Sequence, residues 1–170
     1  MQSLNNLLNR KILTISDPKY SKLKFTVLQW NALPRCYSNP TSYPRAQPEH
    51  VNFDYRKDMI SQEIRSFDAD LVCLEEIDTT DIDFFKSLFN TQKYHFLYEK
   101  KVYSNDAVVL AVNKKFEVIE TERVVHLKSD DPNDFDNQVS LVAVLKYSEK
   151  NFNYYAIVSV VHVKAGPIYR

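Results

Sequence analysis

The stretch DLVCLEEID, residues 70–78, decides the fold. Its first half is a nearly continuous apolar run, which is typical of a strand buried in the middle of a sheet. Three carboxylates, Glu75, Glu76 and Asp78, follow directly. Ionised carboxylates are costly to bury unless they are paired or bound to a metal, and ligands of α/β proteins gather at the carboxyl ends of strands. We therefore predict a central strand with an acidic candidate site at its end.

Upstream of this strand, the pattern predicts another strand, a long loop and a helix. Residues 25–30 read as a buried strand. The loop over residues 34–48 is rich in proline and has no glycine, and loops of this length in compact domains are often functional. Residues 52–67 predict a helix, because apolar residues recur at i, i+4 and i+7 from Ile60.

Downstream, Thr80 and Asp83 form a capping-box-like start for a second helix that runs to about Phe89. Acidic and polar residues predict a loop over 129–137, and a hairpin turn is expected at 148–151. Strands are predicted at residues 94–101, 107–112, 116–127, 139–147 and 153–163. The order of elements implies an α/β fold, in which a mixed β-sheet has flanking helices on one face.

The bulk composition limits the class of protein. A chain of 170 residues with 44% hydrophobic residues can form one domain with a real core. We divide it into an N-terminal arm, residues 1–22, and a domain over residues 23–170. Gly166 is the single glycine, so positive φ angles are expected to fall on Asn and Asp. A formal net charge of zero does not by itself indicate a nucleic-acid-binding protein.

The cysteines and the N-terminal residues bear on the cellular compartment. Cys36 and Cys73 provide neither a disulfide framework nor zinc spacing, which favours an intracellular setting, with the cytoplasm as the first choice. No stretch approaches the roughly 20 apolar residues of a membrane span, so no membrane partner is expected. Residues 1–15 are basic, free of acid and apolar on one helical face. A mitochondrial transit segment is therefore an alternative to the preferred loosely ordered arm.

Two further polar residues lie at the ends of apolar strands. The amide oxygen of Asn31 could bind magnesium or orient a carboxylate, although an ordinary turn asparagine is the alternative. His162 could donate to a phosphate oxygen, or it could be a core histidine with a satisfied hydrogen bond. The acidic cluster has its own alternative, a solvated strand end that leads into a helix cap. Strict strand alternation places Glu76 on one face of the sheet and Glu75 and Ile77 on the other.

Other chemistries find no support in the residue pattern. A glycine-rich phosphate loop needs more than one glycine. The chain also has no His/Cys cluster with zinc spacing and no G-x-S-x-G nucleophile elbow.

Three segments together resemble a known family. LQWNAL (28–33), DLVCLEEID (70–78) and VVHVKAG (160–166) occur in the order and at the spacing of the endonuclease/exonuclease/phosphatase family. The aspartate after the glutamates and the H-x-K-A run are similar to the branch of deadenylases, nocturnin and angel-like proteins. The resemblance covers about residues 24–166. It implies the N-terminal portion of a two-sheet, four-layer α/β sandwich.

The resemblance also implies a function. Asn31 and Glu76 match a magnesium site, with Glu76 as the direct ligand, and His162 matches a phosphate-contacting histidine. Asn137 matches an asparagine with a supporting role. The implied activity is Mg²⁺-dependent phosphodiester hydrolysis, most simply by a 3′-exonuclease that acts on RNA poly(A) tails. A nucleotide phosphatase of the nocturnin type and a catalytically dead interaction module are the alternatives.

Two features depart from the family pattern. Asp106 stands where the branch has a glycine, and its bulk is expected to crowd the cleft or to shift the loop. The family's later motifs, an Asp-x-Asn pair, a further Asp and a terminal Asp-His pair, have no counterpart in the sequence. We therefore expect the chain to be a fragment that is nearly inactive as it stands. We also expect its last strand to expose apolar surface, with marginal stability or association as the result.

Overall fold

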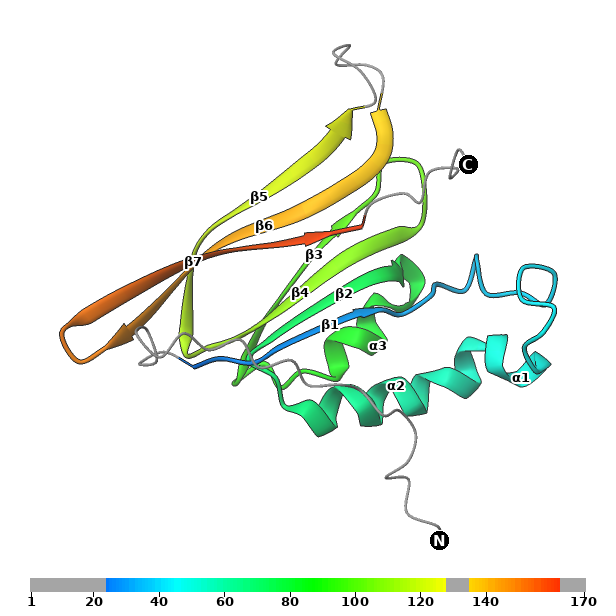
Figure 1. Ribbon diagram of the computed structural model, residues 1–170, viewed down its shortest axis with the longest axis horizontal. Coiled ribbons are helices and arrows are strands. Elements are labelled where there is room, and N and C mark those ends of the chain that lie inside the picture. The colour runs from blue at the N-terminus through cyan, green and yellow to red at the C-terminus, as the bar shows by residue number, and fades with distance from the viewer. Residues whose placement is uncertain (1–23, 128–134, 163–170) are drawn as a thin grey trace, which may run out of the picture.

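The computed structural model describes residues 24–127 and 135–162 and contains two β-sheets (Figure 1). The first sheet has the order β1-β2-β4-β3, with β1 parallel to β2 and the other pairs antiparallel. Its strands are β1 (Val27–Asn31), β2 (Leu71–Asp78), β3 (Tyr94–Lys100) and β4 (Asp106–Asn113). The second sheet is antiparallel, with the order β5-β6-β7. Its strands are β5 (Phe116–Leu127), β6 (Phe135–Glu149) and β7 (Phe152–Val161).

The α/β class and the mixed sheet are confirmed, and the later strands form a separate sheet that packs on the first. The predicted strand positions agree with the structure to within a few residues. The polar loop predicted over 129–137 lies mostly outside the described residues, and β6 begins within it, at Phe135. The N-terminal arm, residues 1–22, also lies outside them.

Helices cover the other face of the first sheet (Figure 1). A short helix, α1 (Pro48–Val51), precedes α2 (Phe53–Phe67), which confirms the helix predicted over 52–67. Asn52 caps α2, because its Oδ1 accepts a hydrogen bond from the backbone N–H of Asp54 at 2.8 Å. Among the described residues, no helix is long and apolar enough to cross a membrane.

The predicted capping box of the second helix is wrong in its details. The capping side chain is Asp78, whose Oδ1 accepts from the N–H and the hydroxyl of Thr80, at 3.0 and 2.8 Å. A 3₁₀ turn, η2 (Thr79–Asp81), then leads into α3 (Ile82–Ser87). Thr80 donates its hydroxyl instead of accepting, because Asp78 at the strand end is the stronger acceptor.

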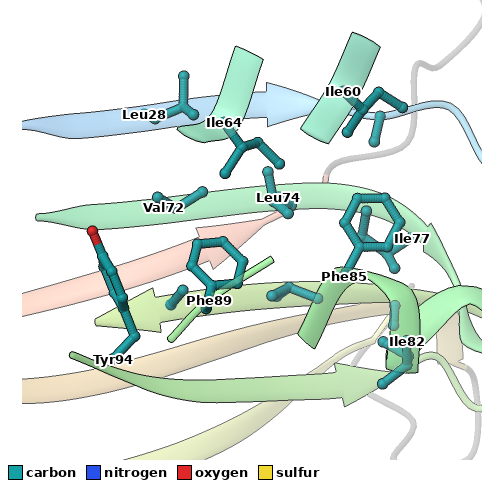
Figure 2. Packing of buried hydrophobic residues seen from close by; sticks show 14 of the residues in the cluster. Leu28, Ile60, Ile64, Val72, Leu74, Ile77, Ile82, Phe85, Phe89 and Tyr94 are labelled. Atoms are coloured by element: carbon teal, nitrogen blue, oxygen red, sulfur yellow. The ribbon is translucent and has the colours of Figure 1, made fainter. Parts of the chain in front are cut away.

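Two apolar cores lie on opposite faces of the first sheet. The helix-side core packs α2 and α3 on the sheet and includes Leu28, Ile60, Ile64, Leu74, Ile77 and Phe85 (Figure 2). The inter-sheet core joins Cys73, Val108 and Leu110 of the first sheet to Val139, Leu141 and Leu145 of β6. The strands β2 and β4 supply side chains to both cores, as their apolar runs predict. Burial raises the pKa of the Cys73 thiol to about 11, as expected for a thiol in an apolar core.

Positive φ angles fall mostly on residue types that the composition did not predict. Among the described residues, the four with positive φ are Leu33, Asp68, Glu76 and Lys150. Asp68 follows the last residue of α2, as expected for an aspartate in a helix C-cap. The other three are neither Asn nor Asp, so the expectation from the glycine-poor composition is mostly wrong.

The outer face of the second sheet exposes apolar side chains on its edge strand. Tyr155 and Ile157 of β7 are 64% and 76% exposed. They pair in register with Lys146 and Val144 of β6, on the face opposite the inter-sheet core. The exposed apolar surface expected for the last strand is therefore present.

Replacing Ile157 with Lys should leave the free energy of unfolding within about 0.5 kcal/mol, because this side chain is mostly in water. The charge on the edge strand should also reduce self-association. Chemical denaturation and analytical ultracentrifugation measure the two effects. Val160→Lys is the control, since Val160 is 2% exposed and a buried unpaired charge should cost about 3–5 kcal/mol. If Ile157→Lys and Val160→Lys lowered the free energy of unfolding equally, Ile157 would be buried in solution.

Candidate active site

The acidic stretch of β2 contains a β-bulge. Leu74 pairs with Val109 of β4 and Ile77 pairs with Ala107, so Glu75 and Glu76 together face a single residue of the partner strand. Glu76 occupies the left-handed region, with φ of 56°. A residue other than glycine in this region is strained, and such residues gather at functional sites.

The bulge corrects the side-chain alternation predicted for this strand. Leu74 and Ile77 both pack in the helix-side core, although strict alternation would place them on opposite faces. Glu75 lies on the other face, where its Oε1 accepts from Nε2 of Gln29 at 2.9 Å. Glu76 points toward the second sheet, since it contacts the residue that follows β7. The two glutamates are thus turned away from Ile77.

Glu76 and His162 meet, although they lie in different sheets. Nε2 of His162 is 3.0 Å from Oε1 of Glu76, and the two side chains are 18% and 14% exposed. Their contact depends on strand direction, because β1, β2 and β7 all run toward the same side of the molecule (Figure 1). The structure therefore brings together two of the three residues singled out in the sequence.

Asn31 ends β1 beside this pair, and its side chain has a local partner. It is in register with Glu75. Its Oδ1 accepts from the backbone N–H of Leu33 at 3.1 Å, which is the turn role considered for it. The guanidinium of Arg56 on α2 donates to the carbonyls of Ala32 and Leu33, at 2.7 and 2.9 Å, and so fixes this turn. No contact joins the side chains of Asn31 and Glu76 among the described interactions.

Lys101 and Asp106 lie at the site. Sequence reasoning expected Asp106 near the cleft but did not predict its buried pairing with Lys101. Lys101 Nζ is 2.6 Å from Asp106 Oδ2 and 3.1 Å from His162 Nδ1. The residues are 4% and 0% exposed. The carboxylate of Asp106 turns inward to this buried ammonium, and the expected crowding of the cleft or shift of the loop stays a prediction. One feature of the sequence could have indicated this pair: Asp106 replaces a glycine of the similar branch and stands five residues after Lys101.

Cys36 and Tyr37, in the loop that follows β1, lie near these carboxylates. Burial raises the pKa of the Cys36 thiol, and the negative charges of Asp78, Asp106 and Glu76 raise it further. The pKa of Tyr37 is raised by the same kinds of effect. Asn137 lies within β6, but its side chain is outside the described part of the structure.

The oxygen donors fit Mg²⁺ in kind. Among the described residues, no three His, Cys, Asp or Glu side chains are grouped to hold a metal ion. Mg²⁺ accepts one carboxylate and completes its octahedron with water and substrate oxygens, so it does not require such a group. The partly exposed carboxylate of Glu76 has Oε1 on His162, and among the described residues its Oε2 has no contact, so this oxygen is the one that could bind a cation.

Comparison with solved structures identifies the fold. No family model matches the chain. ANGEL2, a 2′,3′-cyclic phosphatase solved with adenosine-2′,3′-vanadate, matches 82% of this chain with a TM-score of 0.72 and 21% identity. The human nocturnin catalytic domain matches 85% with a TM-score of 0.62 and 21% identity. An endonuclease/exonuclease/phosphatase protein of Bacteroides vulgatus matches 79% with a TM-score of 0.56 and 16% identity. The chain has the endonuclease/exonuclease/phosphatase fold.

Comparison with curated proteins indicates the branch. The Ccr4 3′-5′-exoribonuclease subunit of the CCR4-Not complex of Schizosaccharomyces pombe is 38% identical over 63 residues, which cover 37% of this chain. The Kluyveromyces lactis subunit is 23% identical over 166 residues, which cover 83%. The matches span 9% and 21% of these relatives, and 41% and 51% of the ANGEL2 and nocturnin chains. The resemblance to the deadenylase, nocturnin and angel-like branch is confirmed.

Glu76→Gly should be more stable than Glu76→Ala by about 1 kcal/mol, because glycine adopts the left-handed conformation without steric cost. Both variants lose the carboxylate, so the difference between their free energies of unfolding reports the cost of the backbone conformation alone. Chemical denaturation measures these free energies. At Glu75, which is not among the residues with positive φ, the order should reverse, with Ala the more stable. A more stable Ala variant at position 76 would show that the bulge is absent in solution.

Proposed function

We propose that this chain carries the N-terminal part of a Mg²⁺-dependent phosphodiesterase site, with Glu76 as the metal ligand and His162 as a donor to a phosphate oxygen. The contact between Glu76 and His162 carries the proposal. It places a carboxylate and an imidazole from two sheets 3.0 Å apart, partly exposed, at the carboxyl ends of their strands. The strained backbone of Glu76 supports a functional role.

The residues of this chain would position the substrate's phosphate. A bound Mg²⁺ would supply Lewis-acid polarisation of a phosphoryl oxygen. Glu76 would hold that ion through the oxygen that His162 leaves free. The His162 Nε2–H lies beside the same carboxylate, and it would exchange its bond to Glu76 Oε1 for a bond to a phosphate oxygen next to the ion. Asn31 would hold the turn after β1 in place, because its amide oxygen is already bonded to Leu33.

The proposed substrate is the 3′ end of RNA, with poly(A) as the first choice. The Ccr4 relatives, which are 3′-5′-exoribonuclease subunits, support an RNA 3′ end as the substrate. The preference for poly(A) comes from the resemblance to deadenylases. A second candidate is hydrolysis of a nucleotide phosphate. It is supported by the likeness to ANGEL2, a 2′,3′-cyclic phosphatase, and to nocturnin.

Glu76→Gln should lower Mg²⁺-dependent hydrolysis of oligo(A) by roughly 100-fold or more, because a neutral amide binds Mg²⁺ poorly and keeps the same shape. The assay uses the full natural polypeptide that carries this sequence, with 3′-hydroxyl and 2′,3′-cyclic phosphate ends as parallel substrates. The matched control is Glu120→Gln, since Glu120 is exposed on the edge strand β5. It should retain parental activity.

Metal binding can be read without catalysis. Millimolar Mg²⁺ should raise the Tm of the parent by mass action and should raise that of Glu76→Gln much less. Hydrolysis of the cyclic end alone would favour the second candidate. Magnesium stabilisation without hydrolysis of either substrate would favour an interaction module. If Mg²⁺ neither stabilises the parent nor supports hydrolysis, the proposed function is wrong.

A further inference from the structure

Four side chains form a continuous line from the turn between β3 and β4 to the acidic end of β2. Asp106 Oδ2 is 2.6 Å from Lys101 Nζ, which is 3.1 Å from His162 Nδ1, and His162 Nε2 is 3.0 Å from Glu76 Oε1. Lys101 and Asp106 are almost fully buried. His162 therefore has one polar neighbour on each ring nitrogen.

The two neighbours of His162 require the same arrangement of its proton. An ammonium group has donors and no acceptor, so Lys101 can bond only to an Nδ1 that lacks a proton. An ionised carboxylate has acceptors and no donor, so Glu76 can bond only to an Nε2 that carries one. The neutral imidazole with its proton on Nε2 satisfies both contacts, and the other neutral form satisfies neither.

Asp106 keeps Lys101 in the form and position that this arrangement needs. A buried ammonium without a partner is strongly unfavourable, and the buried carboxylate at 2.6 Å supplies that partner. The backbone N–H of Lys101 also donates to the carbonyl of Asp106 at 3.0 Å. The turn is thus closed by a backbone bond and a side-chain bond between the same two residues, which leaves the ammonium little freedom to move.

We propose that Lys101, held in place by Asp106, is a positioning residue that fixes the proton of His162 on Nε2. The orientation of the imidazole toward Glu76 is then set at its other ring nitrogen, by a pair that is almost fully buried. The catalytic consequence rests on the proposed function: His162 would offer an N–H, instead of a lone pair, to a phosphate oxygen. The proton position itself can be measured independently.

The experiment is ¹⁵N NMR of the histidine rings, at a pH above the range in which histidine takes up a proton. The chain has 4 histidines, and His162→Gln assigns the signals of His162. In the parent and in Glu76→Ala, Nδ1 should be unprotonated and Nε2 should carry the proton, because Lys101 suffices to fix it. Adding Lys101→Met and Asp106→Ala together to Glu76→Ala should move the Nδ1 shift toward the average of the two neutral forms.

Replacing Lys101 and Asp106 together avoids an uncompensated buried charge, and exchange of a buried ion pair for apolar groups is often neutral or stabilising. Lys100→Met is the matched control, since the Lys100 ammonium contacts Asn105 instead of His162, at 3.3 Å. It should leave the His162 shifts unchanged. If the combined variant does not fold, the spectra of the parent and of Glu76→Ala still test the proposal. The His162 ring of Glu76→Ala should then show only the neutral form with its proton on Nε2.

A proton on Nδ1 in the parent would overturn the proposal. Averaging already in Glu76→Ala would also overturn it, because Glu76 would then be the residue that sets the proton. An unchanged Nδ1 shift after loss of Lys101 and Asp106 would have the same meaning. Failure of the proposed function looks different: hydrolysis and magnesium stabilisation would be absent while the proton stays on Nε2.

Discussion

Burial of β2 and β4 on both faces is the constraint on which the rest of this structure depends. Helices cover one face of these strands and the second sheet covers the other, so their middle residues must be apolar. Polar side chains are then confined to the strand ends, where partners or solvent are available. The acidic end of β2, the start of β4 and the residue after β7 meet there, which concentrates the charged groups at one edge.

The positions of strands and of α2 could be predicted because they depend on local patterns. The apolar run before Glu75 and the helical repeat from Ile60 each identify an element without knowledge of its neighbours. The residue pattern alone did not predict the separation into two sheets, since it depends on which face of β4 each later strand covers. Only the family resemblance implied a two-sheet sandwich, and the structure has two sheets. The bulge at Glu76 was missed for a related reason: strict alternation is the default for a strand, and the departure is visible only in the pairing with β4.

Motif order singled out Glu76 and His162, which lie far apart in the chain and in contact in the structure. The side chain of Asn31 bonds to Leu33 instead of to either of them, and the metal roles of Asn31 and Glu76 stay predictions. Asp106 was singled out by the resemblance, but its pairing with Lys101 was beyond sequence reasoning, because an ion pair across a short turn is ordinary on a surface. What makes this pair unusual is its burial against His162, and that depends on the docking of β7.

The crowding of carboxylates has a consequence for the chemistry of the neighbouring thiol. A cysteine reacts with alkylating agents and peroxides as its thiolate, and negative charges nearby disfavour that form. Cys36 is exposed, yet burial of its thiol group and the charges of Asp78, Asp106 and Glu76 raise its pKa. Burial, together with the charge that would attract a cation to this edge, therefore disfavours the reactive thiolate of Cys36.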